Sequence, residues 1–186
     1  MAVILNIETS TNVCSVAVTA EGMVLTHYED FQGQNHAALL SGYIKACLDY
    51  LREKEMTLDA VAVSIGPGSY TGLRIGLSEA KGLAYALNIP LIGIDTLQIM
   101  AVSVMFKHDV DPESLFVPMI DARRMEVYTA VYDMALDAGV AYVAGEFFHP
   151  DGSGRNTMRM NFSFMTPEKI TQGVKLLAEL LSRITN

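Results

Sequence analysis

The stretch SIGPGSYTGLRIG at residues 64–76 is the most informative part of the sequence, because it joins an apolar segment to an amphipathic one through a glycine-rich loop. Residues 58–65 are mostly small and apolar, which predicts a buried strand. Residues 73–87 place leucine and alanine at helical spacing. Gly66 and Gly68 allow a tight turn, and Ser69 and Thr71 are residue types that cap helices. The pattern predicts a strand, a constrained loop and a helix in succession.

The predicted loop can be interpreted in two ways. Where a glycine-rich loop leads from a strand into a helix, backbone N–H groups can point at an anion, and such a loop can cradle a phosphate. The same composition suits a tight crossover that binds nothing. Within the helix, Gly76 and Gly82 leave small faces that another element can approach. The residues alone leave both interpretations open.

The flanking segments predict an α/β protein with two lobes. Residues 2–8, 14–19 and 23–28 predict three strands in an antiparallel meander, and a helix follows from Asn35, a suitable N-cap. Beyond the loop and its helix, we expect a strand at 89–94, a helix at 96–104, and strands at 115–121 and 126–132. Strands that feed helices after an initial meander favour an α/β architecture.

Charge and composition limit the class of partner. Residues 1–136 hold 16 Asp and Glu against 8 Lys and Arg, whereas residues 137–186 hold 5 of each kind. Because clustered Lys and Arg bind phosphate backbones, we expect a partner to hold any nucleic acid involved. No apolar stretch is long enough to span a bilayer, so we expect no membrane association. Cys14 and Cys47 lack metal-site spacing and are expected to be buried, reduced thiols of a cytoplasmic protein.

Four motifs carry a resemblance to a known family. ILNIETST at 4–11, GPGSYTGLRIG at 66–76, AKGLA at 80–84 and DARRMEVY at 121–128 resemble the bacterial TsaB (YeaZ) proteins, over about residues 1–135. The resemblance implies the actin-like, ribonuclease-H-like (ASKHA) fold. It also implies a role in making N6-threonylcarbamoyladenosine in tRNA. There, TsaB pairs with the catalytic TsaD, the ATPase TsaE is also engaged, and tRNA is bound only indirectly.

The same resemblance implies two candidate sites. Helices of this lobe form the contact with TsaD and also the homodimer contact, so the helices that begin near His36 and Thr71 are expected to form a partner interface. Its expected residues are His36, Leu39, Leu40, Tyr43, Leu73, Gly76, Leu77 and Ala80. A nucleotide cleft, with ATP or ADP at the partner interface, would use Thr9, Ser10, Gly66, Gly68, Ser69 and Thr71.

The residues favour a scaffold without catalytic residues of its own. In TsaD, a His-x-x-x-His on one helical face binds a metal, and the matching positions here are Thr96 and Met100, which cannot replace imidazole ligands. Ser69 has no identifiable His base, so the glycoprotease label long attached to the family has no support. We therefore expect no metal and no resident cofactor. The alternative is a residual ATP-binding hydrolase.

The tail departs from the family pattern. Residues 138–148 and 151–163, followed by a predicted helix from Thr166, resemble the C-terminal small domain of fold-type-I aminotransferases that depend on pyridoxal phosphate. In those enzymes, an arginine that matches Arg159 grips the substrate carboxylate. Nothing earlier resembles their cofactor-bearing domain, so we do not expect pyridoxal phosphate, and a fragment derived from such an aminotransferase, using Arg159, is the less favoured alternative function. The predicted organisation is a first lobe at 1–100, the start of a second lobe at 101–136, and an aminotransferase-like segment at 137–186 that truncates or replaces the rest.

Overall fold

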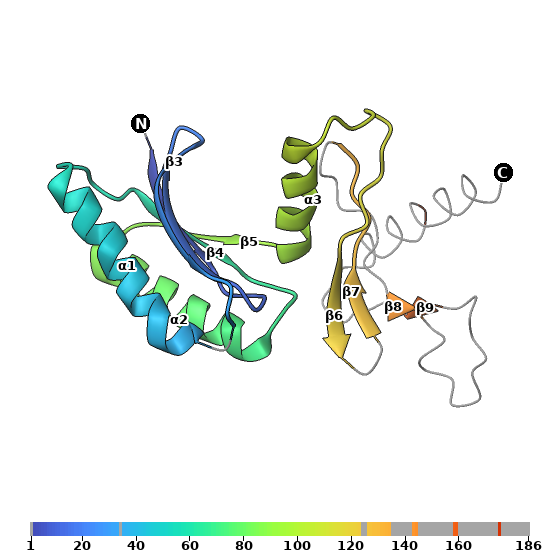
Figure 1. Cartoon of the computed structure of the whole chain (residues 1–186), viewed down its shortest axis with the longest axis horizontal. Helices are drawn as coiled ribbons and strands as arrows, with labels where there is room; N and C mark the ends of the chain where they lie inside the picture. Colours follow the sequence, from blue (N-terminus) through green and yellow to red (C-terminus); the bar gives the residue numbers. More distant parts are fainter. Residues whose placement is uncertain are drawn as a thin grey trace. The chain divides into compact units, whose positions relative to one another are not determined.

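The computed structural model describes residues 2–33, 35–123, 126–134, 143–144, 158–159 and 175. The chain divides into two compact units, Met1–Thr96 and Leu97–Asn186 (Figure 1). The mixture of strands and helices confirms the predicted α/β class. The lobe boundaries expected at residues 100 and 136 stay predictions.

The first unit is built on a five-stranded sheet. Its strands are β1 (Val3–Glu8), β2 (Cys14–Ala20), β3 (Met23–Asp30), β4 (Ala60–Ser64) and β5 (Leu91–Ile94), in the order β3-β2-β1-β4-β5. β1 to β3 pair antiparallel, which confirms the predicted meander, whereas β4 pairs parallel with both β1 and β5. The carboxyl ends of β1 and β4 therefore meet at one edge of the sheet.

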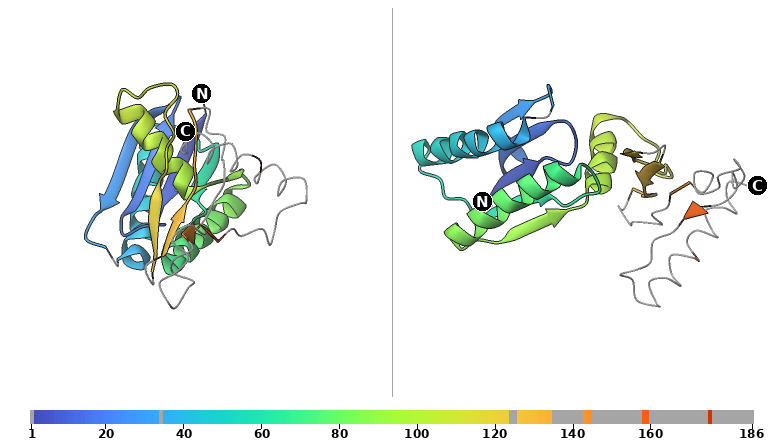
Figure 2. Two further views of the ribbon diagram at one scale, coloured as in Figure 1. Left: turned by 90° about the vertical axis from the view of Figure 1, so that its right-hand side faces the viewer. Right: turned by 90° about the horizontal axis from the view of Figure 1, so that it is seen from below.

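Two long helices, α1 (His36–Glu53) and α2 (Tyr70–Leu87), cover one face of this sheet (Figure 1). The view from below in Figure 2 shows them side by side. Alternate residues of β1 point toward the helices, because side chains alternate between the two faces of a strand. The buried core comprises Val3, Leu5 and Ile7 from β1, Leu40, Ile44, Cys47 and Leu51 from α1, and Ala80 and Ala84 from α2, with further strand residues.

The helix starts follow the predicted residues. Asn35 precedes α1, as expected, but its side chain makes no capping hydrogen bond. Ser69 precedes α2, and its hydroxyl accepts a hydrogen bond from the Gly72 N–H, which confirms the predicted cap. At the other end of α2, Asn88 takes the left-handed conformation that ends many helices.

The part of the second unit that the structure describes contains α3 (Thr96–Lys107) and four short strands. β6 (Met119–Arg123) and β7 (Glu126–Thr129) form an antiparallel hairpin, shorter than the strands expected at 115–121 and 126–132. A small core joins the helix to this region and comprises Leu97, Ala101, Phe116, Ala130 and Tyr132. In the tail, β8 (Val143–Ala144) pairs antiparallel with β9 (Met158–Arg159), and the helix predicted from Thr166 falls outside the described residues apart from Lys175.

Both cysteines are free and buried, as predicted. Burial raises the pKa of the Cys47 thiol to about 11, which leaves little of the reactive thiolate near neutral pH. Within the part of the chain that the structure describes, no helix combines the length and the apolar character needed to cross a bilayer.

Candidate functional site

The carboxyl ends of β1 and β4 place two loops in direct contact. The turn at residues 9–12, called the 9–12 turn below, follows β1, and the loop at residues 65–69 follows β4. The Ser69 N–H donates a hydrogen bond of 2.6 Å to the Ser10 carbonyl. The structure therefore brings together two halves of the predicted nucleotide cleft that are more than fifty residues apart in sequence.

Glu8 links the two strand ends beneath this contact. Its Oε1 atom accepts a hydrogen bond of 2.6 Å from the Ser10 N–H and one of 2.8 Å from the Ser64 hydroxyl. The first bond closes the start of the 9–12 turn, and the second joins β1 to β4. Hydrogen bonds to a charged acceptor are stronger than neutral ones, so Glu8 holds the local shape of both loops.

The glycines after β4 let α2 pack directly on the 9–12 turn. A Cβ atom on Gly68 would overlap the Ser10 carbonyl oxygen, one on Gly72 would overlap the Thr9 carbonyl oxygen, and one on Gly76 would overlap Thr9 Oγ1. Gly66 has a φ of 101°, which L side chains rarely adopt. The glycines of the GPGSYTG stretch thus have a packing reason that requires no ligand.

The same packing occupies donors that an anion would need. The Ser69 N–H binds Ser10, the Gly72 N–H binds the Ser69 hydroxyl at 3.3 Å, and the Leu73 N–H binds the Ser69 carbonyl at 2.8 Å. Three buried hydroxyls at this edge, those of Thr9, Ser10 and Thr96, have no hydrogen-bond partner among the described residues. Of the predicted cleft residues, Thr71 lies exposed in the first turn of α2. Nucleotide binding stays a prediction.

The first residue of α1 also contacts the 9–12 turn. His36 Nε2 donates a hydrogen bond of 3.0 Å to the Thr11 carbonyl, and only 8% of the residue is exposed. His36 therefore faces inward and is not available to touch a partner, contrary to its expected place in the interface. The periodic pattern placed His36 on the helix correctly but could not show that its side chain folds back onto a turn.

Several other residues of the predicted interface belong to the core. Leu40 is 1% exposed and Ala80 is fully buried, while Gly76 packs on Thr9. These three residues, like His36, therefore lie in the interior of the unit and not on the contact surface expected for them. The physical reason is that the apolar stripe of an amphipathic helix marks the side that packs on its own sheet.

The remaining predicted interface residues are half-buried and flank the helix pair. Tyr43 stacks on Tyr28 of β3 with ring centres 5.7 Å apart, and Leu77 packs against the core. Leu73 lies beside Gly66, while Leu39 keeps partial exposure. These four side chains are the part of the predicted set that retains accessible surface, and their contact with a partner stays a prediction.

The outward surface of α1 and α2 has a different character. At 100° per residue, the residues opposite the buried stripes are mostly small or polar, with Tyr85 as a large aromatic exception. This surface, called the outer helix face below, comprises Ala38, Ser41, Gly42 and Lys45 of α1 and Thr71, Ser78, Gly82 and Tyr85 of α2. Ser41 Oγ donates a hydrogen bond of 2.7 Å to Glu79 Oε1 and joins the two helices.

Gly42 and Gly82 lack the packing reason that explains Gly72 and Gly76. Apart from the glycine itself, its two chain neighbours and the helix's own nearby backbone, no atom of the described chain lies within 4 Å of where a Cβ atom would stand on either residue. Glycine in a helix interior costs about 0.5–1 kcal/mol relative to alanine. Gly42 and Gly82 therefore destabilise their helices, and no contact within the described chain explains why glycine stands at these positions.

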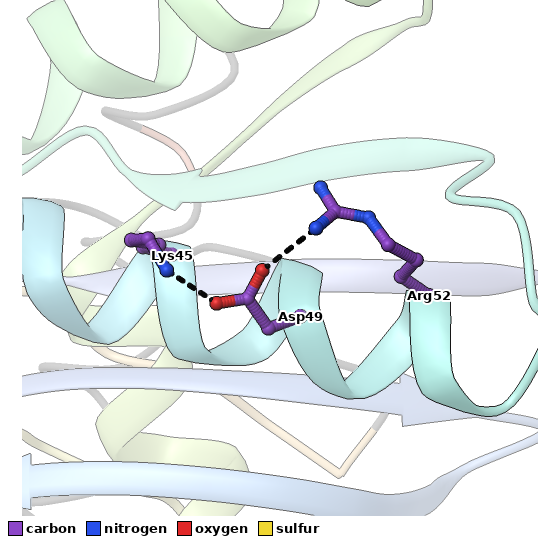
Figure 3. A network of polar contacts seen from close by, with 3 residues as sticks. All are labelled: Lys45, Asp49 and Arg52. Atoms are coloured by element: carbon purple, nitrogen blue, oxygen red, sulfur yellow. Dashed lines mark hydrogen bonds and ion pairs between the residues drawn. The ribbon is translucent and has the colours of Figure 1, made fainter.

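The basic side chains of the first unit gather on the helix layer. Figure 3 shows Asp49 between Lys45 and Arg52 on α1, with contacts of 2.5 and 3.2 Å. The hydrogen bond from Lys45, and then the charges of both neighbours, lower the pKa of Asp49. All the Lys and Arg residues of Met1–Thr96 lie on α1, at its C-cap or on α2, and they are Lys45, Arg52, Lys54, Arg74 and Lys81.

Thr96 and Met100, the residues compared above with metal-binding histidines, both lie in the first half of α3. The Thr96 N–H donates a hydrogen bond of 2.9 Å to the Gly66 carbonyl, and Met100 is half-buried on α3. Within the described ranges, no group of three or more His, Cys, Asp or Glu side chains gathers to hold a metal. Arg159 lies in β9, and its side chain falls outside what the structure describes.

Comparison with known proteins identifies relatives of most of this architecture. The family model of TsaD, tRNA N6-adenosine threonylcarbamoyltransferase, matches residues 28–149. The tRNA threonylcarbamoyladenosine biosynthesis protein TsaB of Bacillus subtilis is 34% identical over 129 residues, which cover 69% of this chain and 54% of that protein. A Pseudomonas aeruginosa protein with similarity to peptidase YeaZ matches with a TM-score of 0.65 and 31% identity, over 77% of this chain and 66% of that one. The chain spans about half the length of the curated relatives that it matches.

A third match is of a different kind. An uncharacterized aminotransferase of Saccharolobus solfataricus is 47% identical over 53 residues, which are 28% of this chain but only 13% of that enzyme. So short a share of the enzyme does not establish an aminotransferase domain. The aminotransferase-like origin of residues 137–186 stays a prediction.

Proposed function

The chain belongs to the TsaD family, on its TsaB (YeaZ) branch, and from this membership we propose that it is a non-catalytic scaffold for a TsaD-like subunit. The pathway is the formation of N6-threonylcarbamoyladenosine in tRNA, the modification named for its relatives. A TsaE-like ATPase joins the same assembly in the cytoplasm, and the TsaD-like subunit holds the tRNA.

One observation carries this proposal. The residues that resemble a phosphate loop pack α2 on the 9–12 turn. Gly42 and Gly82 are exposed on the two helices, and no contact within the described chain requires glycine at either position. Helices approach each other most closely where their contact residues are small. The outer helix face therefore suits close contact with helices of another chain.

Charge supports the same assignment. The basic side chains of Met1–Thr96 lie on the helix layer, whereas the chain as a whole carries a net charge of −8. These basic side chains share the layer with Asp49, Glu53 and Glu79, so a partner would need acidic side chains placed opposite individual Lys and Arg residues. A second copy of the chain would compete for the same surface, so homodimer and heterodimer are alternatives at one site.

Two glycine-to-arginine variants test the interface. Arginine is a good helix former, so Gly42→Arg and Gly82→Arg should leave the isolated chain folded and at least as stable. Each adds a long side chain to the outer helix face and should abolish co-purification of the TsaD-like subunit. Thr57→Arg, at an exposed loop position, is the matched control and should bind normally. Unchanged binding by both glycine variants would refute this interface.

Complementation of a cell that lacks its own TsaB tests the pathway. The unaltered chain should restore N6-threonylcarbamoyladenosine in tRNA, measured by mass spectrometry of tRNA digests, and Gly82→Arg should not. Restoration by both would show that the outer helix face is not required. Failure of the unaltered chain, despite binding to the TsaD-like subunit, would show that this chain does not support the reaction.

A nucleotide site is the second candidate function. The observation in its favour is that the Thr9, Ser10 and Thr96 hydroxyls are buried without a hydrogen-bond partner among the described residues, an arrangement that costs about 1–3 kcal/mol for each group. Titration with ATP and magnesium tests it. Tight, magnesium-dependent binding that Ser10→Ala removes would favour a residual hydrolase, and no binding would leave the scaffold.

A further inference from the structure

We propose that the 9–12 turn is the common anchor that sets α1 and α2 side by side, and that His36 is a positioning residue for the outer helix face. This inference rests on the proposed function and concerns the control of the same contact. His36 is buried, so it would act on the partner contact indirectly, through the position of α1.

The turn fixes the start of α2 through backbone contacts. The Ser69 N–H, one residue before the helix, donates to the Ser10 carbonyl at 2.6 Å. One turn and two turns further along, Gly72 and Gly76 press against Thr9. The Gly72 contact is with the Thr9 carbonyl oxygen and the Gly76 contact is with the Thr9 side chain, so several close contacts hold the first two turns of α2 against the 9–12 turn.

The start of α1 reaches the same turn through one side chain. The His36 Nε2 atom donates to the Thr11 carbonyl at 3.0 Å, while Asn35 makes no side-chain cap and the first turn of α1 contains no acidic residue. A Cβ atom on Gly33, in the connection that leads into α1, would stand at ordinary contact distance from Asn12. The contact between α1 and the 9–12 turn thus depends mainly on one side chain, whereas α2 contacts the turn at several points.

The outer helix face depends on the contacts that both helices make with the 9–12 turn. Gly42 lies six residues beyond His36, which is about 9 Å along the helix axis. A contact that needs close approach at both Gly42 and Gly82 requires the two helices to keep one relative position. Loss of the His36 hydrogen bond would let the start of α1 move while α2 stays in place. We therefore expect binding to weaken even though no contact residue has changed.

Substitutions at His36 separate this role from a structural one. His36→Leu removes the donor, and His36→Gln keeps an N–H at a similar distance from the backbone. In titrations with the purified TsaD-like subunit, His36→Leu should raise the dissociation constant by about three- to tenfold, the equivalent of one net hydrogen bond. His36→Gln should stay within about twofold of the unaltered chain, because the donor is restored.

Urea unfolding of the same variants supplies the second measurement. A dissociation constant that does not change in His36→Leu, together with reduced stability, would show that His36 only stabilises the fold and would overturn the inference. Equal weakening by His36→Leu and His36→Gln would also overturn it, because the hydrogen bond would then not be the cause. If His36→Leu does not fold, His36→Asn, whose amide is too short to reach Thr11, takes its place.

Gly82→Arg, run in parallel, distinguishes the two proposals. If Gly82→Arg leaves binding intact, the outer helix face is not the interface and the proposed function fails at that point. If Gly82→Arg abolishes binding and His36→Leu leaves it unchanged, only the anchor inference fails. If both weaken binding and His36→Gln restores it, both proposals stand.

Discussion

The inner and outer sides of α2 carry glycine for opposite reasons. Gly76 faces inward, where a Cβ atom would meet the Thr9 hydroxyl, whereas Gly82 faces outward, where a Cβ atom would meet nothing within 4 Å beyond its own stretch of helix. The same residue type, six positions apart in one helix, is a packing requirement in one place and an unexplained cost in the other. The difference shows that a glycine points to a partner only when the chain itself does not need it.

The largest expected effect comes from the inner side. Gly76→Arg should lower the free energy of unfolding by about 3 kcal/mol or more, because the side chain has no space between α2 and Thr9. Urea unfolding followed by circular dichroism measures it. Gly82→Arg, the same change on the outer side, is the control and should unfold at or above the unaltered midpoint. Equal destabilisation by both would remove the distinction between the two sides.

The next effect concerns the link beneath the inner side. Glu8→Ala leaves the Ser10 N–H and the Ser64 hydroxyl without their acceptor, and should cost about 2–4 kcal/mol of stability. Glu8→Gln keeps an acceptor oxygen and should lose less than half as much. Both values come from urea unfolding at neutral pH. If Glu8→Ala proved as stable as the unaltered chain, Glu8 would not hold the two strand ends together.

The sequence was sufficient for much of this first unit. Alternating apolar residues predict the meander, helical spacing predicts α1 and α2, and the residue type of Ser69 predicts a cap, since each depends on neighbours close in sequence. The side of the helix that meets a partner was not predictable in the same way. Leu40 and Ala80 are expected on a contact surface but are buried, because apolar periodicity marks the side of a helix that faces its own core.

The candidate site shows the same limit. The cleft residues Ser10, Gly68 and Ser69 do come together, because parallel strands end at one edge of a sheet. Their hydrogen bonds to one another could not be foreseen, because they join segments that are distant in sequence. His36 reaching Thr11 is a further case, since no local pattern shows that a side chain turns back toward an earlier loop.

A smaller effect of opposite sign is expected on the outer side. Gly42→Ala and Gly82→Ala should each stabilise the isolated chain by about 0.5–1 kcal/mol, because alanine restricts the unfolded chain and meets no neighbour. The same variants should bind the TsaD-like subunit more weakly, since a methyl group enters a close contact. If the alanine variants were more stable but bound the TsaD-like subunit as well as the unaltered chain does, close contact with a partner would not be the reason for the two glycines, which would count against the proposed interface.

The smallest effect should come from the charged network on α1. Lys45 and Arg52 are exposed by 77% and 80%, so water and salt screen their contacts with Asp49, and Asp49→Asn should shift the urea midpoint only slightly. The pKa of Asp49 is lowered in the folded chain, chiefly by the hydrogen bond from Lys45. The ionised carboxylate therefore adds to the free energy of unfolding at pH values above its ordinary pKa of 3.8, and this stabilisation disappears as the pH falls through the lowered pKa of the folded chain. The difference between the unaltered chain and Asp49→Asn should therefore be detectable at pH 7 and low salt, and absent at pH 2. A difference that persisted at pH 2 would show that Asp49 contributes through packing and not through its charge.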